Sequence, residues 1–222
     1  MKTAFILLFS CIFITGCEKV DVAEKGKSSI TSDGILSGEI VSYSSSEIDS
    51  LKAFERNKSI VLGKGEVSTN GHFSINLSTP TLTKVSTGYD PALKYSDLTA
   101  SVGALDSIFA YKNNKIVGYL VRNNYTNNSR DSIGLADIHF LYSDKANTLK
   151  GENQLFRPVD SGGYDITSNF DLTFNKGWTE VSIILSDIGM HGLNHNTTYT
   201  MSNVIPLDLK WKFIKTLDGA GL

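Results

Sequence analysis

The sequence predicts an all-β protein made of antiparallel β-sandwiches, with two β subdomains packed together. Runs in which apolar and polar residues alternate recur between residues 34 and 215, and this period of two is typical of half-buried strands. Turn-forming residues separate the runs, so that about ten short strands follow one another, as in sandwiches. With 222 residues, of which 41% are hydrophobic, the chain is long enough to bury a core.

The clearest strand is predicted for residues 72–77, where three large apolar residues alternate with polar ones. Asn70-Gly71 precedes this strand, and the pair favours a tight type I′ turn, in which both central residues adopt a positive φ. We therefore expect residues 60–67 and 72–77 to form a hairpin.

Residues 46–56 allow two interpretations. Ser46 followed by Asp49 resembles a capping box, which would begin a short helix. A strand through Leu51 to Phe54 is the alternative, and we favour it because strands are predicted on both sides. With this strand and the hairpin, residues 34–80 are predicted to form an N-terminal β subdomain.

Residues 81–99 are predicted to connect the two subdomains, because they contain Gly88 and Pro91 and show no clear period. One helical turn near Leu93 is expected within them. Residues 100–222 are predicted to form the C-terminal β-sandwich. Its alternating or apolar runs are residues 108–111, 116–122, 138–142, 170–174, 181–185 and 209–213.

Two turns are predicted inside the C-terminal segment. Asn113-Asn114 separates its first two runs, and asparagine is common in turns. Residues 175–177, Asn-Lys-Gly, separate the runs 170–174 and 181–185, which predicts a second hairpin. The N-terminal group of roughly four strands is small for an independent core, so we expect it to pack against the C-terminal group or to share its sheets.

Residues 34–77 resemble transthyretin-like and carboxypeptidase-regulatory-like β domains. The resemblance lies in the Gly-x-Phe-x-Ile-x-Leu run of residues 71–77, which follows two predicted strands and a hairpin turn. Such domains are usually accessory and non-catalytic, so the resemblance implies a role other than catalysis, although a fold alone does not determine function.

The N-terminus has the parts of a secretory signal: Lys2, an apolar stretch from Phe5 to Ile14, and small residues before a cysteine. The run Ile14-Thr15-Gly16-Cys17 resembles the lipobox of bacterial lipoproteins. The resemblance implies that residues 1–16 are a signal peptide and that Cys17 is the lipid attachment site, carrying diacylglycerol and usually an amide-linked acyl chain such as palmitate. It also implies a Bacteroidota-like outer membrane location, on the periplasmic or the cell-surface face.

Residues 17–33 are expected to be a flexible tether, because they contain few large apolar residues and no sustained period. Cys11 would leave with the signal peptide, so the mature chain would hold only the lipidated Cys17 and no disulfide. Its stability is therefore expected to come from its core.

Composition excludes several classes of protein. With 21 lysines and arginines against 23 aspartates and glutamates, the formal net charge is −2, which argues against a nucleic-acid partner. No P-loop, dinucleotide-binding glycine pattern or nucleophile elbow occurs, so the sequence predicts neither a cofactor nor an enzyme.

Two weak candidate sites remain. His191 and His195 have the spacing of zinc ligands on a helix, with Asp187 as a third ligand, but the glycine and asparagines between them favour a polar surface loop. An exposed Trp178 or Tyr125 would be able to stack on a sugar ring, although single exposed aromatic residues are common.

Three functions follow from these observations. The first is a non-enzymatic, lipid-anchored envelope protein with a structural, adhesive or assembly role, bound to the membrane through its lipid and to an envelope protein or glycan. A fimbrial subunit is one version, weakened because the first arginine after Cys17 is Arg56, inside the folded region. The alternatives are a glycan-binding lipoprotein of a nutrient-uptake system and, with less support, a metal-dependent hydrolase using His191 and His195.

Overall fold

The computed structural model of the chain describes residues 28–55, 60–85, 92–125, 132–159, 162–191 and 194–216. Every regular element among them is a strand, so the predicted all-β class is confirmed. No helix in these ranges is long and apolar enough to cross a membrane. The predicted signal peptide, Cys17 and the first part of the predicted tether lie outside the described residues. The strands are β1 (Ile35–Glu39), β2 (Ser50–Glu55), β3 (Val61–Glu66), β4 (His72–Asn76), β5 (Thr83–Lys84), β6 (Lys94–Tyr95), β7 (Ser101–Lys112), β8 (Lys115–Asn123), β9 (Ala136–Ser143), β10 (Asn147–Val159), β11 (Gly162–Phe174), β12 (Gly177–His191), β13 (Asn194–Ser202) and β14 (Lys210–Lys215).

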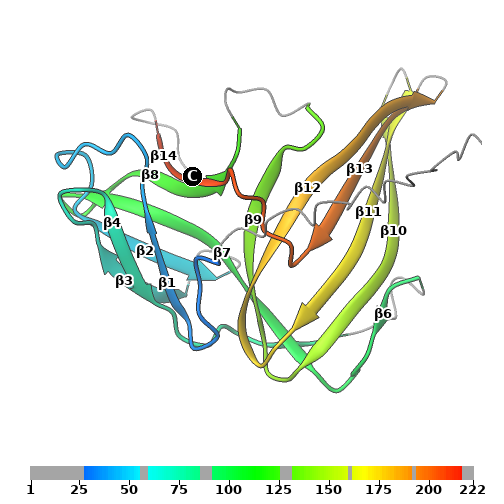
Figure 1. Cartoon of the computed structure of the whole chain (residues 1–222), viewed down its shortest axis with the longest axis horizontal. Coiled ribbons are helices and arrows are strands. Elements are labelled where there is room, and N and C mark those ends of the chain that lie inside the picture. Colours follow the sequence, from blue (N-terminus) through cyan, green and yellow to red (C-terminus); the bar gives the residue numbers. More distant parts are fainter. Residues whose placement is uncertain are drawn as a thin grey trace, which may run out of the picture.

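Strands from both predicted segments share one large sheet. Its order is β3-β2-β7-β8-β9-β12-β13-β11-β10-β6, with β14 added to β8 and β5 added to β7. Two further strands, β1 and β4, form a separate antiparallel pair. Figure 1 shows β1–β4 gathered near one end of the molecule and the long strands β10–β13 at the other.

The β1–β4 pair packs against the large sheet and encloses the main core. Leu36 and Ile75 from this pair are fully buried, as is Leu51 of β2, and Trp211 of β14 is 5% exposed in the same core. Trp211 makes an edge contact with Phe73, with 5.1 Å between ring centroids. The alternation of residues 72–77 therefore points Phe73 and Ile75 into the core, as a half-buried strand requires.

A two-residue turn joins β7 and β8. Asn113 and Asn114 have φ angles of 49° and 62°, and Lys112 and Lys115 on either side are paired in the ladder. Positive φ at both central residues is the geometry of a type I′ turn. Asparagine adopts it at low cost because its short side chain tolerates the left-handed region.

The turn at Asn70-Gly71 differs from the type I′ turn predicted there. Only Gly71 has a positive φ, 84°, and the backbone N–H of Ser68 donates to His72 O at 2.9 Å. A single bridge, Val67 to Phe73, then joins the two sides. Beyond it β3 joins the large sheet and β4 pairs with β1, because their apolar residues face one another across the core and do not lie side by side.

The predicted hairpin between residues 170–174 and 181–185 is wrong. β11 and β12 are consecutive along the chain, but β13 lies between them, parallel to β11 and antiparallel to β12. The short turn after Phe174 is compatible with this arrangement, since the two strands diverge from it and β13 fills the space. Alternation predicts the strands but carries no information on which strands are neighbours.

Strand pairing shows the structure of residues 50–55 and of the end of the connection. Residues 50–55 form β2, so the strand interpretation of residues 46–56 is confirmed. Leu93 immediately precedes the two-residue strand β6, which pairs with β10, so residues 92–99 of the described chain do not contain the helical turn expected near Leu93. The connection instead contributes two short edge pairs, β5 and β6, to the large sheet.

The folded body begins before the predicted end of the tether. Ile30 is 8% exposed and belongs to the main core. The N–H of Trp178 donates to Ser32 O at 3.0 Å, and Ser28 and Ser29 donate to the Glu180 carboxylate. Residues 28–33 are thus part of the body and not of the tether, because they complete its core and hydrogen bonding.

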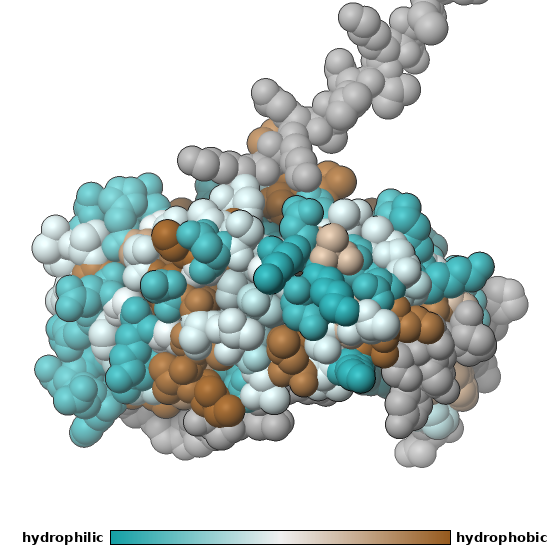
Figure 2. Space-filling view, turned by 90° about the horizontal axis from the view of Figure 1, so that it is seen from below, coloured by the Kyte–Doolittle hydropathy of each residue, from teal (hydrophilic) through white to brown (hydrophobic). Residues whose placement is uncertain are grey.

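A second, smaller core lies on the other face of the sheet. It is built on Leu149, Leu172, Phe174 and Val181, all of which are on β10–β12. In the view of Figure 2, apolar residues form several separate patches with polar residues between them. The large apolar residues of the two cores are thus placed inside, and no continuous apolar surface is visible on this side.

Candidate functional site

An opening in the large sheet forms where β7 changes partner. The first half of β7 pairs with β9, ending at Leu105 opposite Phe140, and the second half pairs with β8, starting at Ile108 opposite Leu120. β8 and β9 are paired at one position, Asn123 opposite Asp137. The three strands therefore bound a cavity of about 210 Å³.

A bulge at Asp106 accompanies the change of partner. On the β2 side, Leu105 and Ser107 are paired with consecutive residues, so Asp106 has no partner in the ladder and its side chain is exposed. A bulge bends a strand and redirects a side chain, and bulges are frequent near functional sites. Here the bulge directs a carboxylate to the rim of the cavity.

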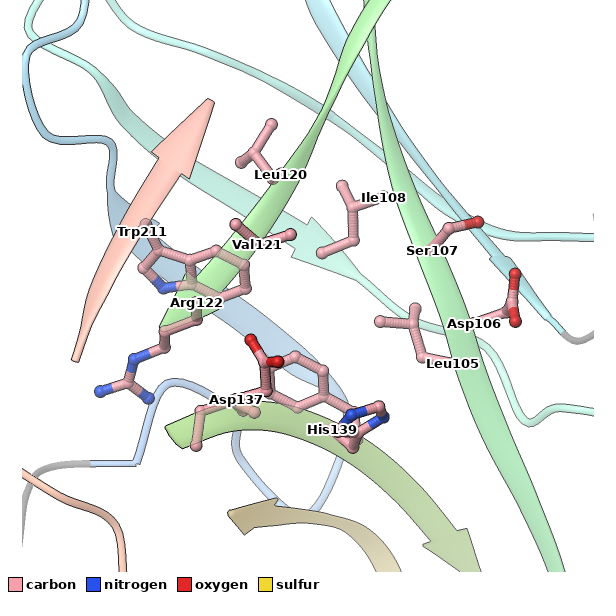
Figure 3. Close-up of a pocket in the computed structure, with 12 residues that line it drawn as sticks. Leu105, Asp106, Ser107, Ile108, Leu120, Val121, Arg122, Asp137, His139 and Trp211 are labelled. Carbon is pink, nitrogen blue, oxygen red and sulfur yellow. The ribbon is translucent and has the colours of Figure 1, made fainter. Parts of the chain in front are cut away.

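The cavity has a polar rim and an apolar floor (Figure 3). The rim is formed by Asp106, Ser107, Asp137 and His139. The floor is formed by side chains of the main core, Leu105, Ile108, Leu120, Phe140 and Trp211. A ligand held here would meet hydrogen-bonding groups at the entrance and apolar carbon below.

His139 is the central titratable group of the rim, and Figure 3 places it between Asp137 and Asp106. More than a third of its surface is open to solvent, yet it lies in a concave position with protein on several sides. Burial in this position lowers the pKa of the imidazole, and the negative charges of Asp137 and Asp106 oppose this by raising it.

Asp137 is held by a hydrogen bond from the Tyr125 hydroxyl. Lys212 lies beside this pair, where its ammonium donates to Asn123 Oδ1 at 2.9 Å and to the Tyr125 carbonyl. Burial and then the neighbouring Lys210 lower the pKa of Lys212, while Asp137 and Asp208 raise it. Hydrogen bonds made by Tyr125 and Lys212 thus hold one side of the rim in place.

Two buried polar atoms of the cavity lining have no hydrogen-bond partner among the described residues, Ser107 Oγ and Trp211 Nε1. Buried polar atoms are usually hydrogen-bonded, and water or a ligand satisfies many of those that lack a protein partner. The Ser107 hydroxyl is therefore able to form a hydrogen bond with a ligand without breaking a hydrogen bond within the protein.

Next to the cavity, Arg122 and Glu180 form a buried ion pair. Their side chains are 11% and 2% exposed, and in Figure 3 the Arg122 guanidinium lies on the side of the cavity opposite Asp106 and Ser107. Glu180 also accepts hydrogen bonds from Ser28 Oγ at 2.9 Å and Ser29 N at 2.6 Å. The ion pair thus joins the cavity wall to the segment through which the chain enters the body.

The aromatic residues proposed from the sequence occupy different positions. Trp178 is 4% exposed and contacts Tyr142 edge-on at 5.6 Å, so it is a core residue and not an exposed stacking platform. Its strand turns this side chain toward β1, against Gly34. Tyr125 lies near the cavity, where its hydroxyl donates a hydrogen bond to Asp137.

The proposed metal ligands are not brought together in the described part of the chain. Asp187 is opposite Thr198 in the β12–β13 ladder, whereas His195 is opposite Met190. His195 is exposed and stacks on Tyr164, with 5.3 Å between the rings. His191 ends β12, and its side chain is outside the described residues. Within those residues no three His, Cys, Asp or Glu side chains form a group suited to a metal ion.

Comparison with known protein families, curated proteins and solved structures found no match. The sequence did not predict that Asp106, Ser107 and Asp137 share a site with His139. The only signal was the alternation in β9, which placed His139 opposite the apolar residues. Asp106 and Ser107 lie close to Asp137 and His139 because β7 changes partner, and alternation does not reveal this change.

Proposed function

We propose that this protein is a lipid-anchored, non-enzymatic envelope protein whose β body has a structural, adhesive or assembly role at the outer membrane. The observation that carries the proposal is the lipobox-like run ending at Cys17. In this proposal the lipid fixes the chain to the membrane and the body contacts another envelope component.

The distance between anchor and body supports this arrangement. The folded body is held from Ser28 onward by the Glu180 carboxylate. Only residues 18–27 separate Ser28 from Cys17, and ten residues span at most about 35 Å when fully extended. The body would therefore stay close to the membrane, as a protein that assembles with other membrane components requires.

Cys17→Ala tests the anchor. We expect the variant to lose metabolic fatty-acid labelling and to accumulate as an uncleaved precursor, while wild-type protein is labelled and fractionates with the outer membrane. Replacing Cys11, which lies inside the apolar stretch, with alanine is the matched control and should leave labelling unchanged. Label retained in Cys17→Ala would disprove the lipid attachment.

Glycan binding is a second candidate, favoured by one exposed aromatic pair. Tyr164 is 43% exposed, and its ring stacks on that of His195 on the same face of β11 and β13. Rings exposed in this way present an apolar surface that a sugar is able to stack on. Calorimetry with soluble polysaccharides tests the candidate: binding should be lost in Tyr164→Ala and kept in Tyr119→Ala.

A further inference from the structure

A second cavity lies beside the first half of β7, at residues 102–104, just before the change of partner. It has a volume of about 460 Å³, which is within the usual range for small-molecule sites. Strands β2, β5, β6, β7, β9, β10 and β11 all contribute to its lining. Its walls include Tyr95, Leu141, Leu149 and Phe174, which belong to the second core.

Among the described residues, one charged side chain lines this cavity. Glu55, at the end of β2, lines the cavity and is 8% exposed. Its two oxygens accept hydrogen bonds from Thr81, one from the backbone N–H at 2.8 Å and one from Oγ1 at 2.9 Å. No ion pair joins it to a lysine, arginine or histidine of the described residues.

This environment is unusual for a carboxylate. Buried carboxylates are normally paired with a cation, because a charge removed from water without one is costly. Each carboxylate oxygen has a further lone pair beyond the one used by Thr81. The group is thus able to accept one or two more hydrogen bonds, and a positively charged donor would also neutralise it.

We propose that this cavity binds a primary amine carried on a small apolar body. The ammonium would donate to the free lone pairs of Glu55, and the apolar body would contact Leu141, Leu149 and Phe174. The lining is mainly apolar, with hydroxyl groups on Thr81, Thr83 and Tyr95. A carboxylate at one side of such a cavity selects a cationic ligand over an acid, which it repels.

The probe is 2-phenylethylamine, with 2-phenylethanol as its uncharged counterpart. Titration calorimetry of the full chain in phosphatidylcholine nanodiscs measures both, and neutral lipid avoids attracting the amine to the membrane. We expect the amine to bind at least ~10-fold more tightly than the alcohol, since a hydrogen bond to a charged group contributes about that factor or more.

Two variants test whether the probes bind in this cavity. Glu55→Gln keeps an oxygen acceptor for Thr81 but removes the charge, so it should lose the ~10-fold preference for the amine while still binding the alcohol. Ala104→Leu narrows the cavity from β7 and should weaken both probes. A thermal scan of each variant verifies that it is folded.

Three results would overturn the proposal. They are the absence of amine binding to the wild-type chain at millimolar concentration, an unchanged preference in Glu55→Gln, and unchanged binding of both probes in a folded Ala104→Leu. If Glu55→Gln does not fold, two measurements still test the proposal. They are the preference of the wild-type chain for the amine and the weaker binding of both probes to Ala104→Leu.

Discussion

Replacing Glu180 with alanine is expected to destabilise the protein strongly, because this carboxylate joins three parts of the chain. It is paired with Arg122 of β8 and accepts hydrogen bonds from Ser28 and Ser29 at the start of the body. Both side chains of the ion pair are almost fully buried, at 11% and 2% exposure. Water therefore does not screen the attraction between the two charges effectively, and it solvates Arg122 poorly when Glu180 is removed.

The size of the effect follows from this burial. Removing one partner of a buried ion pair costs about 3–5 kcal/mol, because the remaining charge stays in a poorly solvated position. For a domain of this length, each kcal/mol lowers the midpoint of thermal unfolding by about 2–4 °C. Glu180→Ala should therefore lower the midpoint by roughly 6–20 °C.

Urea unfolding at pH 7 measures the loss, and Asp171→Ala is the matched control. Asp171 pairs with Lys150 at 2.9 Å, but their side chains are 71% and 63% exposed, so its removal should leave the unfolding midpoint nearly unchanged. The double variant Arg122→Met/Glu180→Leu should cost much less than the sum of its single variants, since it leaves no buried charge. Equal losses for Glu180→Ala and Asp171→Ala, or strict additivity in the double variant, would refute the reasoning.

Two more substitutions test the core and the cavity rim. Phe73→Asp should cost more than the ~3–5 kcal/mol of a Phe-to-Ala change, because Phe73 is 5% exposed against Trp211 and a buried carboxylate adds its own penalty; an unchanged melting temperature would show that the strand faces are misassigned. His139 has a lowered pKa in the folded state, so the unfolded state binds more protons as the pH falls below the ordinary histidine value of about 6.5, and stability should fall there. Comparing denaturation of wild type and His139→Asn between pH 7.5 and 5 measures this loss; the same slope in both would exclude His139 as its source.

Alternation predicted which side chains of a strand face the core wherever the strand is covered on one face. Phe73, Ile75 and Leu77 are all buried, as their period of two requires. Trp178 shows where this inference fails: its position after a turn suggested exposure, but the segment from Ser28 to Ser32 passes over the start of β12 and covers it. That segment lacks a strand pattern, so no local signal indicated the cover.

Turn composition was informative about the presence of turns and less so about their geometry. Asn113-Asn114 forms the turn with two positive φ angles, while Asn70-Gly71 has the stronger local preference for it. The difference comes from the strands on either side. β7 and β8 stay paired beyond their turn, which keeps it tight, whereas β3 and β4 separate into different sheets after one bridge.

Both cavities lie along β7, which pairs with several strands. The alternation of apolar and polar residues in the sequence does not show this pairing. β7 is twelve residues long and pairs along its length with β2, β5, β8 and β9. A strand that changes partner leaves a gap at the change, and the bulge at Asp106 absorbs the mismatch in register. The polar rim beside Asp106 forms at this gap, and the cavity with Glu55 forms beside the first half of β7, at residues 102–104, where the short strands β5 and β6 also contribute to its lining. The candidate sites of this protein are therefore consequences of sheet topology. The predicted strands contain His139 and Phe174, whereas Asp106 lies outside every predicted run. Thr81, Thr83 and Tyr95, which line the second cavity, fall in the predicted connection.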